Sequence, residues 1–180
     1  MSDRAMEASA RACANIALAK YWGKADVKRN IPAVPSISLT LDQLVTETRV
    51  RFDASVKADV VRLDGRRATR DEAERVTAML DRVRREARLH LNAHVTSHNH
   101  FPTAAGLASS ASGFAALAAA ASAAAGLRFN ARRLSALARA SSASAARSIY
   151  EGFVELPAGS RGDADLMERK TAEVLKIMQK

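Results

Sequence analysis

Residues 99–113, which read NHFPTAAGLASSASG, contain the strongest local signal in the sequence. A strand predicted over residues 91–98 leads into this stretch, and a helix predicted over residues 109–125 follows it and ends at Gly126. Free backbone amides at such a helix N-terminus bind phosphate through hydrogen bonds and the helix dipole. The stretch lacks the Gly-Lys-Ser/Thr ending of a Walker A loop. Two interpretations are open here: a phosphate-binding loop or ordinary helix capping.

Two further stretches contain residues that can bind anions. Residues 14–24 read ANIALAKYWGK, in which Lys20 and Lys24 flank the single tryptophan of the chain. Residues 141–148 read SSASAARS, whose small side chains let a ligand approach the backbone while Arg147 grips a carboxylate or phosphate. Each stretch also has a plainer interpretation: a strand end with solvated lysines in the first case, and a low-complexity linker in the second.

Ahead of these motifs and between them, alternating apolar and polar residues predict short strands. The predicted strands cover residues 13–22, 37–41, 46–52 and 59–63. Pro32 and Pro35 mark an irregular connection, because proline removes a backbone donor and restricts its predecessor. Asp64 and Gly65 predict a tight turn. Together these segments predict a meander.

Helical spacing begins after a capping box at Thr69. The apolar positions of this predicted helix are Val76, Leu80, Val83 and Ala87. A shorter helix is predicted after Asn130, with Leu134 and Leu137 facing inward, and a further strand over residues 148–156. Because strands and helices mix without strict alternation, the sequence predicts an α+β fold.

The chain length favours one domain. The sequence has 180 residues, and the predicted domain covers residues 1–157. Residues 158–180 are predicted as a tail, a linker followed by a short helix over residues 166–180, which is too short to be a second domain.

The charge balance predicts anionic partners. The 28 lysines and arginines outnumber the 19 acidic residues and give a net charge of +9, which attracts nucleic acid, acidic lipid or phosphorylated small molecules. Aromatic residues make up only 4% of the chain, which weighs against nucleic acid. The arginines along the first predicted helix and its approach are interpreted as a solvated face; they are Arg66, Arg67, Arg82, Arg84, Arg85 and Arg88.

Other residues exclude several classes of protein. No run of about 20 apolar residues predicts a membrane span, and the N-terminus has no signal-peptide pattern. The single cysteine, Cys13, cannot form an internal disulfide, which favours the cytoplasm. Four histidines would lie on one face of a continuous strand; they are His90, His94, His98 and His100. Residues two apart on such a face are about 7 Å apart, too far for the ligands of one zinc ion. No metal ligand is predicted, and Asp53, Asp59 and Asp64 are predicted to have neither a partner nor a role.

Taken in order, the three motifs resemble the mevalonate diphosphate decarboxylase family of the GHMP kinase superfamily. The likeness extends over about residues 12–157, and the first two motifs are specific to the decarboxylase branch. It implies a GHMP-kinase-type N-terminal domain of the ribosomal protein S5 domain 2-like fold, with a mixed sheet and helices packed on one face. It also implies that the catalytic aspartate of the family lies in a C-terminal domain that this chain lacks.

The implied reaction is the ATP-dependent decarboxylation of 5-diphosphomevalonate to isopentenyl diphosphate, with Mg²⁺ as the second cofactor. By this resemblance Lys20 and Arg147 are catalytic, with Arg147 orienting the carboxylate. The residues implied to bind substrate are Tyr21, Trp22, Gly23, Lys24, Ser142, Ser144 and Arg147. Those implied to hold ATP phosphates are Gly106, Ala108, Ser109 and Ser110.

Departures from the family pattern leave other functions open. Ser141, Ala143 and Glu151 stand where the family has glycines. The alternatives are a non-catalytic phosphate-binding or interaction module, or a sister activity such as a mevalonate phosphokinase or phosphomevalonate decarboxylase. A homodimer is a further possibility, because apolar surface would be exposed where a second lobe docks.

Overall fold

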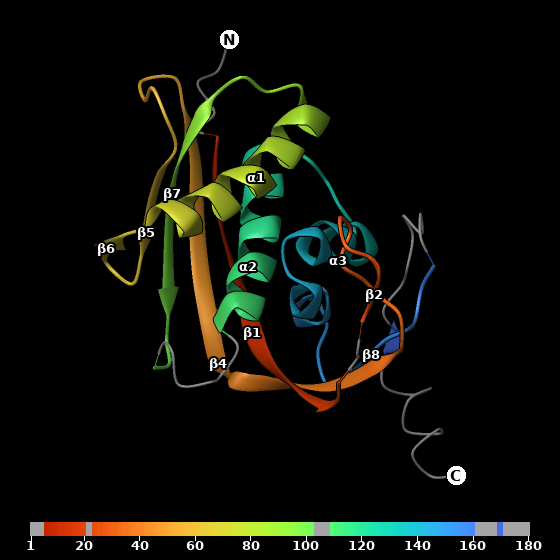
Figure 1. Cartoon of the computed structure of the whole chain (residues 1–180). Helices are drawn as coiled ribbons and strands as arrows, with labels where there is room; N and C mark the ends of the chain where they lie inside the picture. Colours follow the sequence, from red (N-terminus) through yellow and green to blue (C-terminus); the bar gives the residue numbers. More distant parts are fainter. Residues whose placement is uncertain (1–5, 21–22, 103–108, 161–168, 171–180) are drawn as a thin grey trace.

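The computed structural model describes residues 6–20, 23–102, 109–160 and 169–170 (Figure 1). Its strands are β1 (Glu7–Ala19), β2 (Lys24–Asp26), β3 (Ile31–Pro32), β4 (Ser36–Asp53), β5 (Val60–Leu63), β6 (Arg66–Arg67), β7 (Asn92–Asn99), β8 (Phe153–Leu156) and β9 (Arg169–Lys170). Its helices are α1 (Arg70–Ala87), α2 (Ser109–Ala124), α3 (Ala131–Ser141) and the 3₁₀ helix η1 (Ala143–Ile149). The predicted α+β class is confirmed.

The main sheet is built around β4. Strand β1 pairs with β4 along nearly its whole length, β7 pairs with its second half, and β8 pairs with its first four residues, all antiparallel. Strands 37–41 and 46–52, predicted as separate, are therefore parts of one strand. The intervening residues continue the extended backbone, and the register shifts between Cys13 and Ala14 of β1, where residues 42–44 of β4 have no paired residue in β1.

The predicted meander is wrong. Strand β5 lies beside β7 and runs parallel to it, rather than pairing with β4. The reason is α1, which connects β5 and β6 to β7 as a crossover and so returns the chain in the same direction. The tight turn at Asp64 and Gly65 is confirmed: both residues have positive φ, and the turn joins β5 to β6. The sheet is thus mixed, as the family resemblance implied.

Helices α1 and α2 cover one face of the sheet (Figure 1). The capping box at α1 is confirmed, because Glu72 N donates to Thr69 Oγ1 at 3.4 Å and Thr69 N donates to the Glu72 carboxylate at 2.8 Å. Helix α2 is rich in alanine and buried on almost every side. Its small side chains allow the helix to lie close against β1 and β4, so the helix stands in the centre of the domain.

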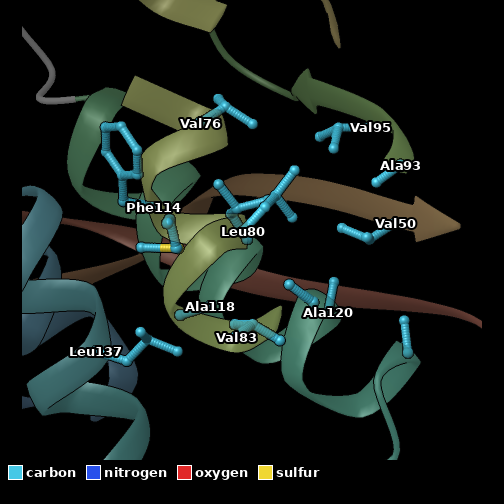
Figure 2. Close-up of a cluster of buried hydrophobic side chains, with 14 of the residues drawn as sticks. Val50, Val76, Leu80, Val83, Ala93, Val95, Phe114, Ala118, Ala120 and Leu137 are labelled. Carbon is cyan, nitrogen blue, oxygen red and sulfur yellow. The ribbon is translucent and has the colours of Figure 1, made fainter. Parts of the chain in front are cut away.

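The core fills the space between the sheet and these helices (Figure 2). Val50 of β4 and Val95 of β7 are paired neighbours in the sheet, and Leu80 and Val83 of α1 belong to the same buried cluster. Phe114 of α2 closes one end of the cluster. The opposite sheet face carries charged residues such as Arg49, which are exposed.

The C-terminal part differs from expectation in its details. Helix α3 follows Asn130 and Leu137 is buried, as predicted, whereas Leu134 is only half-buried; the Asn130 side chain caps the helix. The strand predicted over residues 148–156 is shortened to β8, because the preceding small residues form η1. Strand β9 pairs with β8 inside the segment predicted as a helix. Within the described part of the chain, no helix is both long and apolar enough to cross a membrane.

Candidate functional site

The first and third motifs meet at Asn15, near the middle of β1. Its Nδ2 donates to the backbone oxygen of Ser144 at 3.0 Å and to Ser148 Oγ at 2.8 Å. Asn15 is 4% exposed, so these bonds form away from solvent. The low-complexity linker interpretation of residues 141–148 is therefore wrong: the segment is a helical turn packed against β1.

Arg147 lies at the centre of the same cluster and is 3% exposed. Its Nη1 donates to Ser36 Oγ on β4 at 2.7 Å, and its Nη2 lies 3.5 Å from Asn15 Oδ1. The guanidinium is thus held by residues of β1 and β4. Ser142 Oγ and Ser144 Oγ, from the same segment, lie 3.2 Å apart on half-buried residues. We call Asn15, Ser36, Arg147 and Ser148 the Arg147 centre.

The lysine motif continues from β1 into the small β2–β3 sheet. Lys20 and Lys24 are both exposed, and Lys24 Nζ donates to Asn30 Oδ1 at 2.7 Å. Gly23 has φ +76, and its oxygen accepts a hydrogen bond from Ala33 N at 3.3 Å. The glycine therefore makes the bend that turns the chain into β2. Tyr21 and Trp22 lie outside the described residues.

The second region lies at the N-terminus of α2, where a cavity of about 170 Å³ opens between α1, α2 and the sheet. Its apolar wall includes Val76, Val95 and Phe114, and Ser109 and Ser110 line it from the helix end. Ser110 is exposed and Ser109 is half-buried. We call this cavity the α2 pocket. Gly106 and Ala108, the other predicted phosphate-binding residues, lie outside the described residues.

A hydrogen-bonded network joins the end of β7 to the first turn of α2. Thr46 Oγ1 of β4 lies 2.6 Å from both Asn99 Oδ1 and Ser112 Oγ. Asp64 accepts from Asn99 N at 2.8 Å and from Asn99 Nδ2 at 3.1 Å. The end of β7 and the first turn of α2 are thereby fixed to the same strand.

Charged residues gather at the mouth of the α2 pocket. Arg66 donates to both carboxylate oxygens of Glu72, at 2.7 and 2.8 Å. The hydrogen bond from Arg66, together with that from Thr69 N, lowers the pKa of Glu72 to about 2. Arg75 lies over the Phe114 ring, 4.7 Å from its centroid. The mouth therefore presents an ion pair and a further cation beside the helix end.

Several residues of these regions were not predicted as site residues. Ser36 and Ser148 looked like ordinary small residues, and their role follows only from the pairing of distant strands. Asp64, which was predicted to have no partner, binds Asn99 at the α2 pocket. Glu72 was predicted only as a capping residue. The turn at Asp64 and the capping box, which are close in sequence, were the signal that could have indicated that Asp64 and Glu72 lie near each other at the pocket.

Other predictions about charged residues need correction. Asp59 is not isolated, because Arg84 Nη1 donates to its Oδ2 at 3.2 Å and Ala93 N donates to its Oδ1 at 2.8 Å. Arg84 is therefore half-buried rather than solvated. Asp53 likewise pairs with Arg51 at 3.0 Å.

The remaining titratable groups offer neither a metal centre nor a thiolate. His98 lies 3.4 Å from Asp64 and stacks edge-on against His100. Among the described residues there is no group of three or more histidine, cysteine or acidic side chains placed to hold a metal. Burial raises the pKa of the Cys13 thiol, and the nearby carboxylates of Asp42 and Glu151 add to this effect. The thiol therefore remains protonated at neutral pH.

Known proteins share both the sequence and the fold. Diphosphomevalonate decarboxylase of Ganoderma lucidum is 41% identical over 173 residues, which cover 86% of this chain and 43% of that protein. The structure of mevalonate diphosphate decarboxylase from Enterococcus faecalis, described with a mevalonate diphosphate-mediated ATP binding mechanism, is 46% identical with a TM-score of 0.86; the match covers 92% of this chain and 51% of that one. A further structure, MDDEF in complex with MVAPP, AMPPCP and magnesium, has 46% identity and a TM-score of 0.85, over 92% of this chain and 50% of that one.

The chain thus spans about half the length of these relatives. A family model for the diphosphomevalonate decarboxylase-like N-terminal domain matches residues 12–167, which is most of the sequence. This match extends across the Arg147 centre and the α2 pocket, so the chain belongs to the family of diphosphomevalonate decarboxylase-like N-terminal domains.

Proposed function

We propose that this chain forms the substrate- and nucleotide-binding lobe of an enzyme that decarboxylates 5-diphosphomevalonate with the use of ATP and Mg²⁺. The observation that carries the proposal is the bond from Asn15 to Ser148, which joins two motifs separated by 133 residues. Relatives named as diphosphomevalonate decarboxylases support the reaction class. Because the chain spans about half of their length, the proposal concerns the activity of the whole protein.

The Arg147 centre is the proposed binding site for the acid end of the substrate. A guanidinium group offers two parallel donors that match a carboxylate. Asn15 and Ser36 hold this group in a fixed orientation, which reduces the entropy that would be lost on binding. Ser142 and Ser144 add hydroxyl groups beside it. Tyr21, Trp22, Gly23 and Lys24 are proposed to surround the diphosphate, with Lys20 near the reacting groups.

The α2 pocket is the proposed nucleotide site. Its apolar wall suits a flat heteroaromatic base, and the helix N-terminus beside it suits phosphate. Ser109 and Ser110 would donate to phosphate oxygens together with the predicted loop residues Gly106 and Ala108. Mg²⁺ usually binds through phosphates and only one or two carboxylates, so the described residues fit it as an ion that enters with the nucleotide.

The chemistry requires a better leaving group than hydroxide. ATP supplies the phosphoryl group that makes the tertiary hydroxyl of the substrate able to depart. The residues of this chain bind and orient: Arg147 holds the carboxylate that leaves as carbon dioxide, and the lysines offset the charge of the diphosphate. No general base is proposed among the described residues, and the family aspartate is expected in a second lobe.

Calorimetric titration of 5-diphosphomevalonate into the 180-residue chain tests the substrate site. Lys24→Gln should weaken substrate binding about fivefold or more, whereas its matched control Lys28→Gln, an exposed lysine in the same hairpin, should change it less than twofold. Arg147→Ala should weaken binding of diphosphomevalonate far more than binding of ATP. Equal losses for both ligands, in a variant that circular dichroism shows to be folded, would remove Arg147 from the substrate site.

Turnover separates the enzyme from a binding module. Without a base, the 180-residue chain should release little or no carbon dioxide from diphosphomevalonate, ATP and Mg²⁺, since general-base catalysis supplies about 10² to 10⁴-fold. Turnover of about 1 s⁻¹ or faster would require a base within this chain. If ligands bind tightly but phosphate transfer occurs without loss of carbon dioxide when the second lobe is supplied, a sister phosphokinase activity is the correct assignment.

The cellular setting forms part of the proposal. We propose a cytoplasmic location, supported by the single cysteine and by the small phosphorylated substrate. A homodimer and the absence of nucleic-acid binding remain predictions. Light scattering of the purified chain at several concentrations, with and without duplex DNA, tests both.

A further inference from the structure

A further cavity, separate from the α2 pocket, is lined by basic side chains of α1 and α3. It has a volume of about 320 Å³, is open to solvent, and is lined by residues of the C-terminal half of α1, of α3 and of the turn between β2 and β3. Five arginines line it: Arg29, Arg82, Arg85, Arg133 and Arg139. We call it the arginine pocket. Its described lining shares no residue with that of the α2 pocket and includes none of Gly23, Lys24, Ser142, Ser144 and Arg147.

The positive charge of the arginine pocket is only partly neutralised. Glu86 is the acidic residue of its described lining, and this carboxylate pairs with Arg133. Asp81, next to Arg82 in sequence, is bound to Arg84 at 2.8 Å. Among the residues that the structure describes, no ion pair is recorded for Arg29, Arg82 or Arg85. In the described part of the chain, three guanidinium groups therefore line one cavity without forming a salt bridge to a carboxylate.

Arg82 and Arg85 are the nearest of these charges in sequence. They are three residues apart on α1, so their side chains lie on the same face of the helix. Burial lowers the pKa of the Arg82 guanidinium, and the charge of Arg85 lowers it further. Arg82 is also held in place, because its Nη1 donates to Ser141 Oγ at 3.2 Å. A bound anion would reduce the repulsion between the Arg82 and Arg85 guanidinium groups, and its attraction would offset the loss of solvation of Arg82.

The third arginine, Arg29, lies in the turn between β2 and β3, and hydrogen bonds hold this turn in place. Arg29 N donates to Asp26 Oδ1 at 3.0 Å, which closes the turn. Asn30, with φ 53, donates from its Nδ2 to the backbone oxygens of Arg139 and Ala140 at 3.1 and 3.2 Å. These bonds attach the turn to the C-terminal end of α3, and the turn in this position contributes Arg29 to the lining of the cavity.

We propose that the arginine pocket binds a small anion that carries two or more phosphate groups. Arginine is suited to this role because its planar fork donates two hydrogen bonds to one phosphate. A cavity of about 320 Å³ has room for a small polyanion, whereas a duplex would need an extended basic surface. Among the residues that the structure describes, the pocket lining holds no aromatic side chain on which a base could stack, which disfavours single-stranded nucleic acid.

Inorganic pyrophosphate is the probe for this site, titrated into the 180-residue chain at about 0.15 M NaCl, where isolated surface charges are screened. Binding is followed by calorimetry and by the ¹⁵N resonances of the arginine side chains. We expect saturable binding with one equivalent per chain at the pocket, and shifts in the resonances of Arg82 and Arg85. Arg85→Gln should weaken this binding about tenfold, and Arg85→Lys should restore part of it.

Two variants serve as controls. Arg62→Gln removes an exposed arginine of β5 outside the pocket and should change pyrophosphate affinity less than twofold. Lys20→Gln lies at the proposed substrate site and should also leave pocket binding unchanged. Arg85 is exposed, so its replacement should not disturb folding, and an unchanged circular dichroism melt verifies this.

Three outcomes would overturn the inference. Equal losses in Arg85→Gln and Arg62→Gln would mean that pyrophosphate responds only to the net charge. A loss in Lys20→Gln without one in Arg85→Gln would place the anion at the proposed substrate site. No saturation up to about 10 mM pyrophosphate, a concentration corresponding to less than about 3 kcal/mol of binding, would mean that the pocket does not select phosphate.

Discussion

The Arg147 centre and the α2 pocket are both polar, but they differ in how far water reaches them. Asn15 and Ser36 of the Arg147 centre are 4% and 1% exposed. At the mouth of the α2 pocket, the side chains of Glu72 and Arg66 are 34% and 54% exposed. A buried polar group that loses its partner is left without water to replace it, whereas an exposed one is solvated again.

Because of this difference, the effects of a substitution on stability and on binding can be measured separately at the α2 pocket but not in the Arg147 centre. In the Arg147 centre the same hydrogen bonds that orient the proposed carboxylate-binding group also join β1, β4 and η1. A substitution there should change both the fold and the affinity. At the α2 pocket, a hydroxyl group can be removed with little effect on the fold, so binding can be measured alone.

The largest effect is expected for Asn15→Leu. The substitution leaves the Ser144 carbonyl and Ser148 Oγ without their shared donor in a buried position, and should lower the free energy of unfolding by about 2–4 kcal/mol. Urea denaturation followed by circular dichroism measures this change. Thr96→Val replaces an exposed side chain of β7; it is the control and should stay within about 0.5 kcal/mol. A similarly small change for Asn15→Leu would show that the centre is more hydrated than its burial indicates.

An intermediate effect is expected for Glu72→Gln. Glutamine keeps the acceptor for Thr69 N but removes the charge paired with Arg66, so the loss should be about 1 kcal/mol because solvent screens this pair.

The pH dependence identifies the charge as the cause. The pKa of Glu72 is lowered from 4.5 to about 2, so its stabilisation is fully present above about pH 4.5 and is lost as the pH falls toward 2. The difference in unfolding free energy between wild type and Glu72→Gln should therefore shrink over this interval. A difference that is constant with pH would assign the effect to capping alone.

The smallest effect on stability is expected for Ser110→Ala. Ser110 is exposed, so the melting temperature should be unchanged within error while ATP affinity falls about fivefold, the loss of one hydrogen bond of about 1 kcal/mol. Calorimetry with ATP and Mg²⁺ and a thermal melt of the same preparation provide the two readouts. A lower melting temperature with unchanged ATP affinity would mean that Ser110 only caps α2.

Local patterns predicted the elements better than their arrangement. The capping box at Thr69 and the turn at Asp64 were visible because their chemistry lies within four residues. The continuity of β4 was not, because Asp42 and Gln43 in its middle are exposed and resemble a turn. The parallel pairing of β5 with β7 depends on where α1 packs, which no local alternation of residues reveals.

The candidate site likewise has parts that the sequence predicts and parts that it does not. The motif containing Arg147 could be recognised from sequence, but its contact with Asn15 joins residues 132 positions apart. The arginine pocket had no motif: Arg29, Arg82 and Arg139 come from three separate elements. Arg82 and Arg84 looked alike in sequence, yet Arg84 is neutralised by Asp59 and Arg82 faces the pocket.

The pairing of β4 with three partners also sets an order for folding. Its contacts with β1 close a short loop, those with β7 a longer one, and the contact between Ser38 and Val154 spans 116 residues. Since longer loops cost more entropy to close, the β4–β8 ladder should form last. Until then the first half of β4 has a free edge, which is the kind of surface on which chains aggregate. The proposed substrate site, built from the strands and η1 beside this ladder, is therefore the part of the molecule that a newly made chain completes at the end.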